Sequence, residues 1–303
     1  MKNSVLDRFR GRVAQQVLTH EPLAPHTSFH IGGPAEYFYT PHGEEDLICA
    51  LRAARALGIP TTILGNGTNV LISDRGVEGL VVRLVETSLH PVVEKGLVLV
   101  RAPMPLSFLL DFAFDRDLAG LEYLVSIPGT VGGAIYMNAG SFSQAISTHL
   151  AYVELLDRDL SYCVKRHEDI DFDYRYSEFQ ESGAVILGAA FDLEQGDGAA
   201  IRLTAERIKS EKRAKQSWEQ PNAGSIFSNP PTTYAGKLIE EAGCKGLQVG
   251  QAQVSMKHAN FIVNLGGATA QDVVQLMDIV VHKVYARFNV RLSPEIRLLG
   301  DFS

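Results

Sequence analysis

The stretch from Ser126 to Gly140 combines residue types that suit the binding of an anion. It reads SIPGTVGGAIYMNAG, with four glycines among fifteen residues and no charged side chain. Glycine is favoured where the backbone takes a positive φ or where a ligand comes close to the main chain. Successive N–H groups without large neighbours also form a concavity suited to phosphate. We therefore expect a phosphate-bearing ligand here, the alternative being a tight turn between two strands.

A second glycine loop, Gly65-Asn66-Gly67-Thr68-Asn69, follows the strand-like run Thr61–Leu64. A Rossmann fold needs such glycines to lead from a strand into a helix, with a third glycine for close packing. Here Val70 stands at the third position and begins another strand-like run, and Glu86, about twenty residues on, is weak support for a ribose-binding acid. We reject the Rossmann interpretation. Two glycine loops, each following a strand, can instead hold the two phosphates of one dinucleotide, and flavin adenine dinucleotide (FAD) would fit.

Three single residues have a chemistry that folding alone does not explain. Arg175 lies between two tyrosines, which can hold a guanidinium flat toward a carboxylate. Ser225 follows an alanine and a glycine, so a substrate could reach its hydroxyl, although the surrounding residues do not form a hydrolase Gly-x-Ser-x-Gly elbow. Glu295 directly follows a proline. A surface arginine, a turn serine and a solvated glutamate are the ordinary alternatives at these positions.

Basic residues and cysteines give weaker signals. Lys212 belongs to a basic cluster at helical spacing with interleaved glutamates, which predicts a solvated helix face. The run His258–Asn264 predicts a strand rather than a metal site, because no second ligand lies at a suitable spacing. Further positive candidates are Lys209, Arg213, Lys215, Lys237, Lys245 and Lys257. The three cysteines (Cys49, Cys163 and Cys244) include no Cys-x-x-Cys pair, so we expect buried small apolar residues rather than disulfides or zinc ligands.

The composition excludes several classes of protein. The chain has 46% hydrophobic and 21% charged residues, which is typical of a soluble globular protein with a sizeable core. A formal net charge of -7 argues against a nucleic-acid-binding protein, whose binding domain is usually basic. The first residues lack the apolar core of a signal peptide, and no apolar run approaches the ~18 residues of a membrane span. We expect a cytoplasmic protein with no nucleic acid partner, no membrane insertion and no obligate protein partner.

The order of the expected elements predicts an α+β fold. Apolar residues at four-residue spacing predict an amphipathic helical segment over residues 1–22. Strands with two or three helices follow, up to a polar, glycine-rich linker at residues 195–198. Beyond the linker a long helix is expected over residues 269–288, capped by Thr269 together with Asp272.

Six motifs, in this order along the chain, resemble the UDP-N-acetylenolpyruvoylglucosamine reductase (MurB) family. They are Thr27-Ser28-Phe29-His30-Ile31-Gly32-Gly33-Pro34-Ala35, Gly65-Asn66-Gly67-Thr68-Asn69, Ile127-Pro128-Gly129-Thr130-Val131-Gly132-Gly133-Ala134, Tyr174-Arg175-Tyr176-Ser177, Ala223-Gly224-Ser225-Ile226-Phe227 and Pro294-Glu295-Ile296-Arg297. Each motif is weak by itself, whereas six in sequence are highly specific. The short Tyr-Arg-Tyr-Ser form is similar to the shorter, type II-like members. Two departures concern diphosphate binding: Ser228 replaces a lysine common in the family, and Lys215–Trp218 lacks the usual Gln-Pro.

The resemblance implies a two-subdomain FAD-binding domain of the vanillyl-alcohol-oxidase (PCMH) type over residues 23–195. A smaller α+β substrate-binding domain over residues 196–303 completes the implied fold. The implied reaction is reduction of FAD by NADPH, followed by hydride transfer to the enolpyruvyl group of UDP-N-acetylenolpyruvoylglucosamine. The product is UDP-N-acetylmuramate, a peptidoglycan precursor. By this resemblance Ser225 donates the proton, while Arg175 and Glu295 flank the enolate-like species.

Contacts with FAD are expected along both glycine loops. The expected residues are Gly65, Asn66, Gly67, Thr68, Asn69, Ser126, Ile127, Gly129, Thr130, Gly132, Gly133, Ile135, Asn138 and Ala139. Two other functions stay open: another flavoprotein of the same fold, such as an alcohol oxidase, and a non-catalytic protein that binds a UDP-sugar or nucleotide. The non-catalytic protein predicts a colourless preparation, and turnover of the enolpyruvyl UDP-sugar with NADPH separates the two enzymes.

Overall fold

The structure is a computed structural model that describes residues 2–85 and 90–303. The chain divides into two compact units, each assembled from three segments. Unit 1 comprises Met1–Val17, Tyr39–Gly65 and Val82–Lys212, and unit 2 comprises Leu18–Phe38, Asn66–Val81 and Arg213–Ser303. The two units divide the chain differently from the three ranges predicted from the sequence, which stay a prediction. Glu86 lies outside the described residues.

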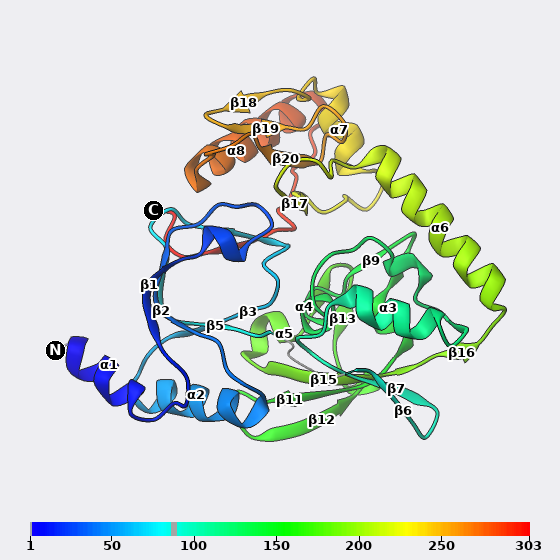
Figure 1. The fold of residues 1–303 in the computed structure, drawn as a ribbon. Helices are drawn as coiled ribbons and strands as arrows, with labels where there is room; N and C mark the ends of the chain where they lie inside the picture. The colour runs from blue at the N-terminus through cyan, green and yellow to red at the C-terminus, as the bar shows by residue number, and fades with distance from the viewer. Residues whose placement is uncertain (1, 86–89) are drawn as a thin grey trace. The chain divides into compact units, whose positions relative to one another are not determined.

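Unit 1 is built around a five-stranded antiparallel sheet in the order β12-β11-β15-β7-β6 (Figure 1). The central strand β15 (Val185–Asp192) is buried at every position but its last, whereas the edge strand β12 (Tyr162–Arg166) alternates between exposed and half-buried residues. Because successive side chains point to opposite faces of a sheet, burial at successive positions of β15 means that both of its faces are covered, whereas β12 has one face open to solvent. The other strands of unit 1 are β3 (Thr61–Leu64), β6 (Val92–Glu94), β7 (Leu97–Arg101), β8 (Leu118–Ala119), β9 (Gly140–Ser141), β10 (Gln144–Ala145), β11 (Leu150–Leu156), β13 (Phe172–Asp173), β14 (Tyr176–Ser177) and β16 (Glu194–Gln195).

Helices of unit 1 pack their apolar side chains against this sheet. Helix α3 (Leu106–Phe114) begins directly after Pro105, and its apolar residues Leu106, Leu109, Leu110 and Ala113 are all buried. The short helix α4 (Val131–Tyr136) contacts β15 and β7, and therefore fixes the glycine stretch to the core of unit 1. The other helical segments of this unit are α1 (Lys2–Arg10), α2 (Glu44–Ala56), η2 (Glu122–Leu124), η3 (Ile146–His149), η4 (His167–Asp169), α5 (Phe179–Ser182) and, up to Lys212, α6 (Gly198–Lys215).

Unit 2 contains a four-stranded antiparallel sheet in the order β17-β20-β19-β18, and α8 packs on it. Helix α8 (Ala270–Phe288) begins with the predicted cap, because Thr269 accepts the N–H of Asp272 and the Asp272 carboxylate accepts the N–H of Thr269. A parallel pair joins β4 to β21. The elements of this unit are β1 (Leu18–Pro22), η1 (Ala24–His26), β2 (Pro34–Tyr39), β4 (Val70–Ile72), β5 (Val77–Arg83), β17 (Asn222–Ser225), α7 (Ala235–Glu241), β18 (Gln248–Val249), β19 (Ala252–Val254), β20 (Phe261–Asn264) and β21 (Arg297–Leu299), with β2 and β5 each ending in unit 1.

The helical segment predicted over residues 1–22 is wrong in its second half. Helix α1 ends at Arg10, immediately before Gly11, and residues 18–22 form β1, which pairs antiparallel with β2. Glycine lowers helix stability by about 1 kcal/mol relative to alanine, and pairing with β2 then decides the conformation of the later residues.

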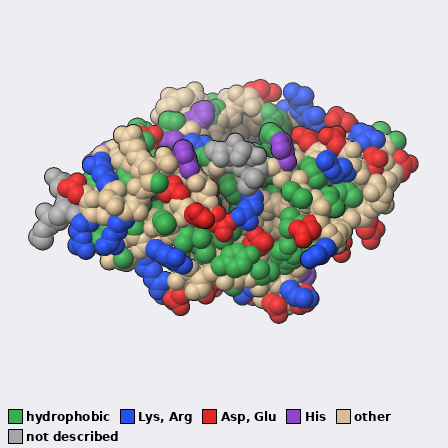
Figure 2. Space-filling model, turned by 60° about the horizontal axis from the view of Figure 1, so that its bottom comes forward, with side chains coloured by type: hydrophobic (Ala, Val, Ile, Leu, Met, Phe, Trp, Pro, Cys, Tyr) green, Lys and Arg blue, Asp and Glu red, His purple; other side chains and the backbone are tan. Residues whose placement is uncertain are grey.

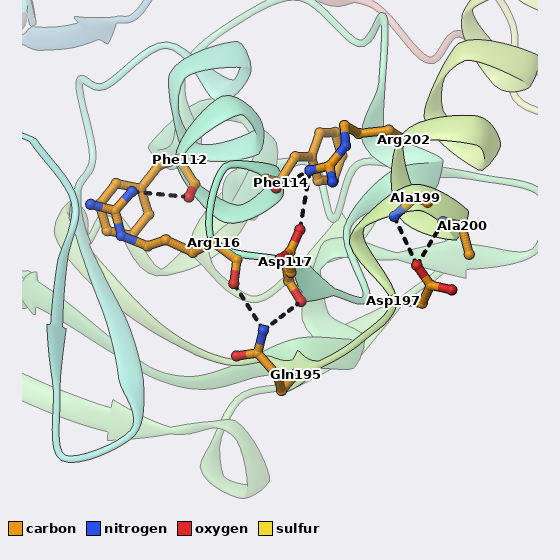
Figure 3. Close-up of polar contacts among 9 residues, drawn as sticks. All are labelled: Phe112, Phe114, Arg116, Asp117, Gln195, Asp197, Ala199, Ala200 and Arg202. Atoms are coloured by element: carbon orange, nitrogen blue, oxygen red, sulfur yellow. Dashed lines mark hydrogen bonds and ion pairs between the residues drawn. The ribbon is translucent and has the colours of Figure 1, made fainter.

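The polar linker predicted at residues 195–198 is also wrong, because hydrogen bonds tie it to unit 1 (Figure 3). The Gln195 side chain donates to the carbonyl oxygens of Arg116 and Asp117 at 3.1 and 3.3 Å. Asp197 accepts the N–H of Ala199 at 2.9 Å at the start of α6. The residues that suggested a linker therefore form the end of β16, which pairs with β8, and the start of α6.

The described residues show a mixed-charge surface on the face drawn in Figure 2 and scattered cysteines. In Figure 2 basic and acidic side chains lie interspersed on the face drawn. Among the described residues, no helix is both long and apolar enough to cross a membrane, and no group of three or more metal-ligating side chains occurs. Cys244 is buried as predicted, whereas Cys49 is exposed and Cys163 half-buried, so the prediction of three buried cysteines is wrong for two of them.

Candidate active site

The glycine stretch of unit 1 forms a turn that leads into α4. Thr130 caps this helix, accepting the N–H of Gly133 at 3.1 Å. The amides of Val131 and Gly132 donate to backbone carbonyl oxygens of residues 104 and 102, at 2.9 and 2.8 Å. The expectation of a row of unshielded N–H donors is therefore wrong for the first turn of the helix, because the amides of that turn bond to residues that follow β7.

Three amides of the stretch make no hydrogen bond to another described residue: those of Ser126, Gly129 and Thr130. Ser126 and Gly129 have positive φ angles of 64° and 123°, which turn the backbone sharply before the helix. A Cβ added to Gly65 would lie 2.9 Å from the Thr130 hydroxyl oxygen, so the first residue of the other glycine loop packs directly on this turn within unit 1. These unpaired donors and the side-chain-free contact fit a phosphate group that is held by the main chain.

The remaining predicted cofactor residues of unit 1 have structural partners of their own. Ile127 donates its N–H to Leu124, and Ala139 donates to Ala134. Ile135 is fully buried in the core. Asn138 is 4% exposed, and its amide nitrogen donates to the Asp173 carbonyl oxygen at 2.8 Å. Asn138 thus joins the end of the glycine stretch to the hairpin that carries Arg175.

Residues 66–69 of the other glycine loop belong to unit 2 and link β3 to β4, as the rejection of a Rossmann fold requires. Gly67 has φ 60°, and an added Cβ would lie 2.3 Å from the His26 carbonyl oxygen, so only glycine fits. Asn69 donates its side-chain N–H to the Glu295 carbonyl oxygen at 3.2 Å. The end of this loop therefore lies beside one of the three predicted catalytic residues.

Arg175 occupies the second position of a two-residue turn between β13 and β14. Its φ is 57°, a left-handed conformation that is uncommon outside glycine and costs energy. The guanidinium donates to the Gly140 carbonyl oxygen at 2.8 Å, and its carbon lies 5.0 Å from the centre of the Tyr174 ring. Stacking on one of the two flanking tyrosines is confirmed, and the turn holds a positive charge at the end of the glycine stretch.

Lys212 contradicts the prediction of a solvated helix face, because it is only 8% exposed. Its ammonium group donates to the carbonyl oxygens of Val125 at 2.6 Å and Tyr123 at 3.4 Å. Burial, together with the positive charge of Arg175, lowers the pKa of Lys212 to about 8. Lys212 therefore anchors the backbone that leads directly into Ser126.

Ser225 and Glu295 come together in unit 2. Ser225 ends β17, after a strand irregularity at which Gly224 has φ 74°. Such irregularities commonly re-aim a side chain beside an active site. The N–H of Glu295 donates to the carbonyl oxygen of Ile226 at 2.8 Å, and the Ser225 hydroxyl has no hydrogen-bond partner among the described residues. Two residues that are 70 positions apart in the sequence therefore lie on neighbouring backbone segments.

A cavity of about 730 Å³ in unit 2 has Ser225 in its wall. Three lysines contribute to the lining, together with two glutamates. The lining residues are Ala214, Lys215, Ser225, Asn229, Tyr234, Gly236, Lys237, Glu240, Glu241, Lys257, His258, Ala259 and Asn260. Burial and the charge of Lys245 lower the pKa of His258, which favours a neutral ring in this wall. The cavity can thus offer several cationic and neutral donors to an anionic ligand next to the serine.

Comparison with known proteins identifies the family. Residues 35–160 match an FAD binding domain, and residues 216–299 match the C-terminal domain of UDP-N-acetylenolpyruvoylglucosamine reductase. The chain is 41% identical to the UDP-N-acetylenolpyruvoylglucosamine reductase of Caldanaerobacter subterraneus over 93% of each chain, and 41% identical to that of Synechococcus sp. over 99% of this chain and 95% of the relative. The chain belongs to the UDP-N-acetylenolpyruvoylglucosamine reductase family.

A solved reductase structure of the same family, MurB from Thermus caldophilus, superposes with a TM-score of 0.79 at 32% identity, covering 94% of this chain and 98% of the other. The family assignment confirms the predicted α+β fold, with an FAD-binding domain and a C-terminal reductase domain, and makes the protein an FAD-dependent oxidoreductase. The matched FAD-binding range includes both glycine loops. The unpaired amides of Ser126, Gly129 and Thr130 fit the diphosphate of this cofactor.

The sequence did not reveal the roles of two buried polar residues, Lys212 and Asn260, which bond to the backbone next to the predicted site residues Ser126 and Ser225. Lys212 continues the buried stripe of α6 formed by Ile201, Ala205 and Ile208, at spacings of four, three and four residues, and this pattern could have revealed its burial. Asn260 is 4% exposed at the start of β20 and hydrogen-bonds to the residues after Ser225. No spacing in the sequence indicates that contact.

Proposed function

We propose that this chain reduces the enolpyruvyl group of UDP-N-acetylenolpyruvoylglucosamine with NADPH, giving UDP-N-acetylmuramate for peptidoglycan synthesis. The observation that carries the proposal is the 2.8 Å hydrogen bond from the Glu295 N–H to the Ile226 carbonyl oxygen. This bond joins the backbone of residue 295 to the residue that follows Ser225, the proton donor by family resemblance, and so supports a shared role for the two residues. Family membership and the match to an FAD-binding domain support the redox part of the proposal.

FAD would supply the hydride chemistry, and the protein would bind and orient the cofactor. Bound FAD would accept hydride from NADPH and pass it to the terminal alkene carbon of the substrate. The amides of Ser126, Gly129 and Thr130, with the contact between Gly65 and Thr130, would hold the cofactor diphosphate. No side-chain cation is needed for that contact, because the main chain provides the donors.

Ser225 would supply the proton that completes the reduction. After hydride addition, negative charge develops on the carbon next to the substrate carboxylate, and that carbon must be protonated. A serine hydroxyl is too weak an acid to ionise beforehand, so the transfer requires an already basic carbanion within hydrogen-bond reach. Among the residues that the structure describes this hydroxyl has no hydrogen-bond partner, and it lies in the cavity wall; both observations support this role.

Two charged residues would stabilise the developing negative charge. Arg175 would offer its fixed positive charge to the substrate carboxylate and the enolate oxygens, which is the largest kind of catalytic contribution in a site shielded from water. Glu295 would act as a hydrogen-bond donor if protonated, or otherwise orient Arg175 or a water molecule. Both roles follow from the family resemblance.

The cavity beside Ser225 would hold the diphosphate of the UDP-sugar. Asn229, Lys215 and Lys237 lie in its wall. Lys237 is 3.9 Å from its carboxylate partner and 64% exposed, so it can turn toward a phosphate at little cost. These residues would compensate for Ser228, which stands where many members of the family carry a lysine.

The test of the proposal separates the two half-reactions. The purified protein should show flavin absorption bands, be reduced by NADPH, and be reoxidised by the enolpyruvyl UDP-sugar without oxygen. In Ser225→Ala, reduction by NADPH should be unchanged, while reoxidation by the substrate should slow by about 10²–10⁴-fold, the usual contribution of a general acid.

Ser228→Ala is the matched control, because that hydroxyl donates to the Ser293 carbonyl oxygen at 3.2 Å instead of lining the cavity. It should reoxidise within about twofold of the wild-type rate. Equal slowing of both half-reactions in Ser225→Ala would contradict the proton-donor role. A preparation that stays colourless after FAD is added would overturn the function itself.

A further inference from the structure

Asn260 directs its whole side chain at one residue of the segment that carries Ser225. It is 4% exposed and lies immediately before β20. Its amide oxygen accepts the N–H of Phe227 at 3.0 Å, and its amide nitrogen donates to the Phe227 carbonyl oxygen at 2.7 Å. Its backbone carbonyl oxygen also accepts the N–H of Ile226 at 2.8 Å. Three hydrogen bonds therefore join Asn260 to the two residues that follow Ser225.

These bonds continue the strand pairing where the regular ladder stops. The last residue pair between β17 and β20 is Ser225 with Phe261. At Phe227 the Asn260 side chain provides one acceptor and one donor, the pair that a neighbouring strand would provide. Buried backbone groups are costly to leave unpaired, so this arrangement specifies where residues 226 and 227 lie.

The opposite edge of the same segment is held by the residues around Glu295. Ile226 accepts the Glu295 N–H at 2.8 Å, and Phe227 forms an isolated bridge with Pro294. Residues 226–227 are consequently fixed from two sides, by Asn260 and by 294–295. The distance between the Ser225 hydroxyl and the Glu295 side chain depends on both attachments.

His258 fixes the backbone of Asn260 in turn. The Asn260 N–H donates to Nδ1 of His258 at 3.2 Å, and the His258 ring lies edge-on to Phe261 with 4.9 Å between ring centres. An unprotonated Nδ1 is needed to accept this bond, in agreement with the lowered pKa of His258. His258 and Asn260 both lie in the cavity wall with Ser225, so the support and the proposed proton donor face the same ligand space.

We propose that Asn260 is a positioning residue for proton transfer, whose amide holds residues 226–227 and thereby places the Ser225 hydroxyl beside Glu295. The proposal rests on the proposed function, since it concerns the protonation step alone. A misplacement of about 1 Å at a reacting group can cost about a hundredfold in rate. A weakly acidic serine is sensitive to such a misplacement because it must donate within hydrogen-bond distance.

The test uses the FAD-loaded enzyme and two variants, Asn260→Ala and Asn260→Asp. In Asn260→Ala, reduction by NADPH and the substrate dissociation constant should stay within about threefold of wild type, while reoxidation by the substrate should slow by about a hundredfold. The solvent deuterium isotope effect on reoxidation should rise, because proton transfer becomes slower than hydride transfer. Asn260→Asp keeps the acceptor for the Phe227 N–H and should restore part of the rate.

Asn264→Ala provides the matched control. Asn264 is 5% exposed on the same strand, but its side chain bonds to Phe29 and to the backbone after β20, not to residues 225–228. It should lower the melting temperature comparably and leave the ratio of the two half-reaction rates unchanged. Hydrogen exchange gives a readout without turnover, since the Phe227 amide, whose acceptor is the Asn260 side chain, should lose protection in Asn260→Ala and keep it in Asn264→Ala.

The possible failures are distinguishable. Wild-type enzyme that is reduced by NADPH but never reoxidised by the enolpyruvyl UDP-sugar would refute the proposed function, and with it the role of Asn260. Normal reoxidation in wild type together with normal reoxidation in folded Asn260→Ala would refute the positioning role alone. Equal slowing in Asn264→Ala would show that general destabilisation is the cause. If Asn260→Ala does not fold, the test uses Asn260→Asp: slower reoxidation relative to reduction by NADPH would support the positioning role, and an unchanged ratio of the two rates would refute it.

Discussion

The cofactor stretch of unit 1 and the serine segment of unit 2 are built in opposite ways. Residues 126–139 form one continuous segment, shaped by positive φ angles and by backbone bonds to nearby elements. In unit 2, Ser225, Glu295 and Asn69 come from three distant parts of the chain, joined by hydrogen bonds such as that from Asn69 to Glu295. The first kind of site is encoded locally in residue types, whereas the second exists only once the strands have paired.

Arg175 gives the strongest test of this contrast, because it is a side chain of unit 1 with an assigned role in the protonation step. In Arg175→Met the reoxidation of reduced enzyme by the substrate should slow by about 10²–10³-fold, through loss of a fixed positive charge. Reduction by NADPH should change little. The measurement is stopped-flow absorbance of each half-reaction.

Arg116→Met is the control for Arg175→Met. Arg116 also places its guanidinium over a neighbouring aromatic ring, 3.7 Å from the centre of Phe112, at the end of α3 (Figure 3). Its removal should leave both rates within about twofold of wild type. If Arg175→Met instead weakened FAD binding alone, Arg175 would be part of the cofactor site, and unit 1 would act only through its backbone.

Lys212 tests how far the local backbone site depends on a buried charge. Its pKa is lowered to about 8 in the folded protein, so between pH 8 and about 10.5 the unfolded chain binds more protons than the folded one. The free energy of unfolding of wild type should therefore rise with pH across this window relative to Lys212→Met, by on the order of 2 kcal/mol. Urea denaturation of both proteins at several pH values measures this difference. Parallel pH curves would show that Lys212 titrates normally.

Gly65 should give the smallest effect, and tests the packing between the two glycine loops. In Gly65→Ala the new Cβ would lie 2.9 Å from the Thr130 hydroxyl oxygen, which must shift and weaken its cap on α4. Because such a cap contributes about 1 kcal/mol, the dissociation constant of FAD should rise about fivefold, measured by flavin fluorescence. Gly11→Ala, where the new Cβ has only an ordinary 3.5 Å contact, should bind FAD normally. Unchanged FAD binding in both variants would mean that this contact does not shape the site.

Local sequence patterns predicted those features whose causes are local. The capping box at Thr269 and Asp272 is observed because both partners lie within one helical turn. The loop at residues 65–69 joins two strands, as Val70 in place of a third glycine indicated. Arg175, Ser225 and Glu295 were found by resemblance to a family, since their types and neighbours alone left ordinary surface roles open.

Features that depend on distant partners could not be predicted in this way. Residues 18–22 became a strand because β2 was available to pair with them. Lys212 looks like a solvated lysine until the carbonyl oxygens of residues 123 and 125 are placed around it. The amide oxygen and amide nitrogen of Asn260 both bond to Phe227 because of the register between two strands, and hydrophobic periodicity in the sequence does not predict that register.

The parallel pairing of β4 with β21 has a consequence for biosynthesis. Strand β4, which directly follows the loop at residues 66–69, acquires this neighbour only from residues 297–299, and Ser73 bonds to Asp301, 228 positions later. During synthesis β4 therefore has no β21 to pair with until more than two hundred further residues have been added. A nascent chain interrupted before residue 295 would lack the carbonyl oxygen to which Asn69 donates, so the end of the loop at residues 66–69 would be unsupported until that residue is added.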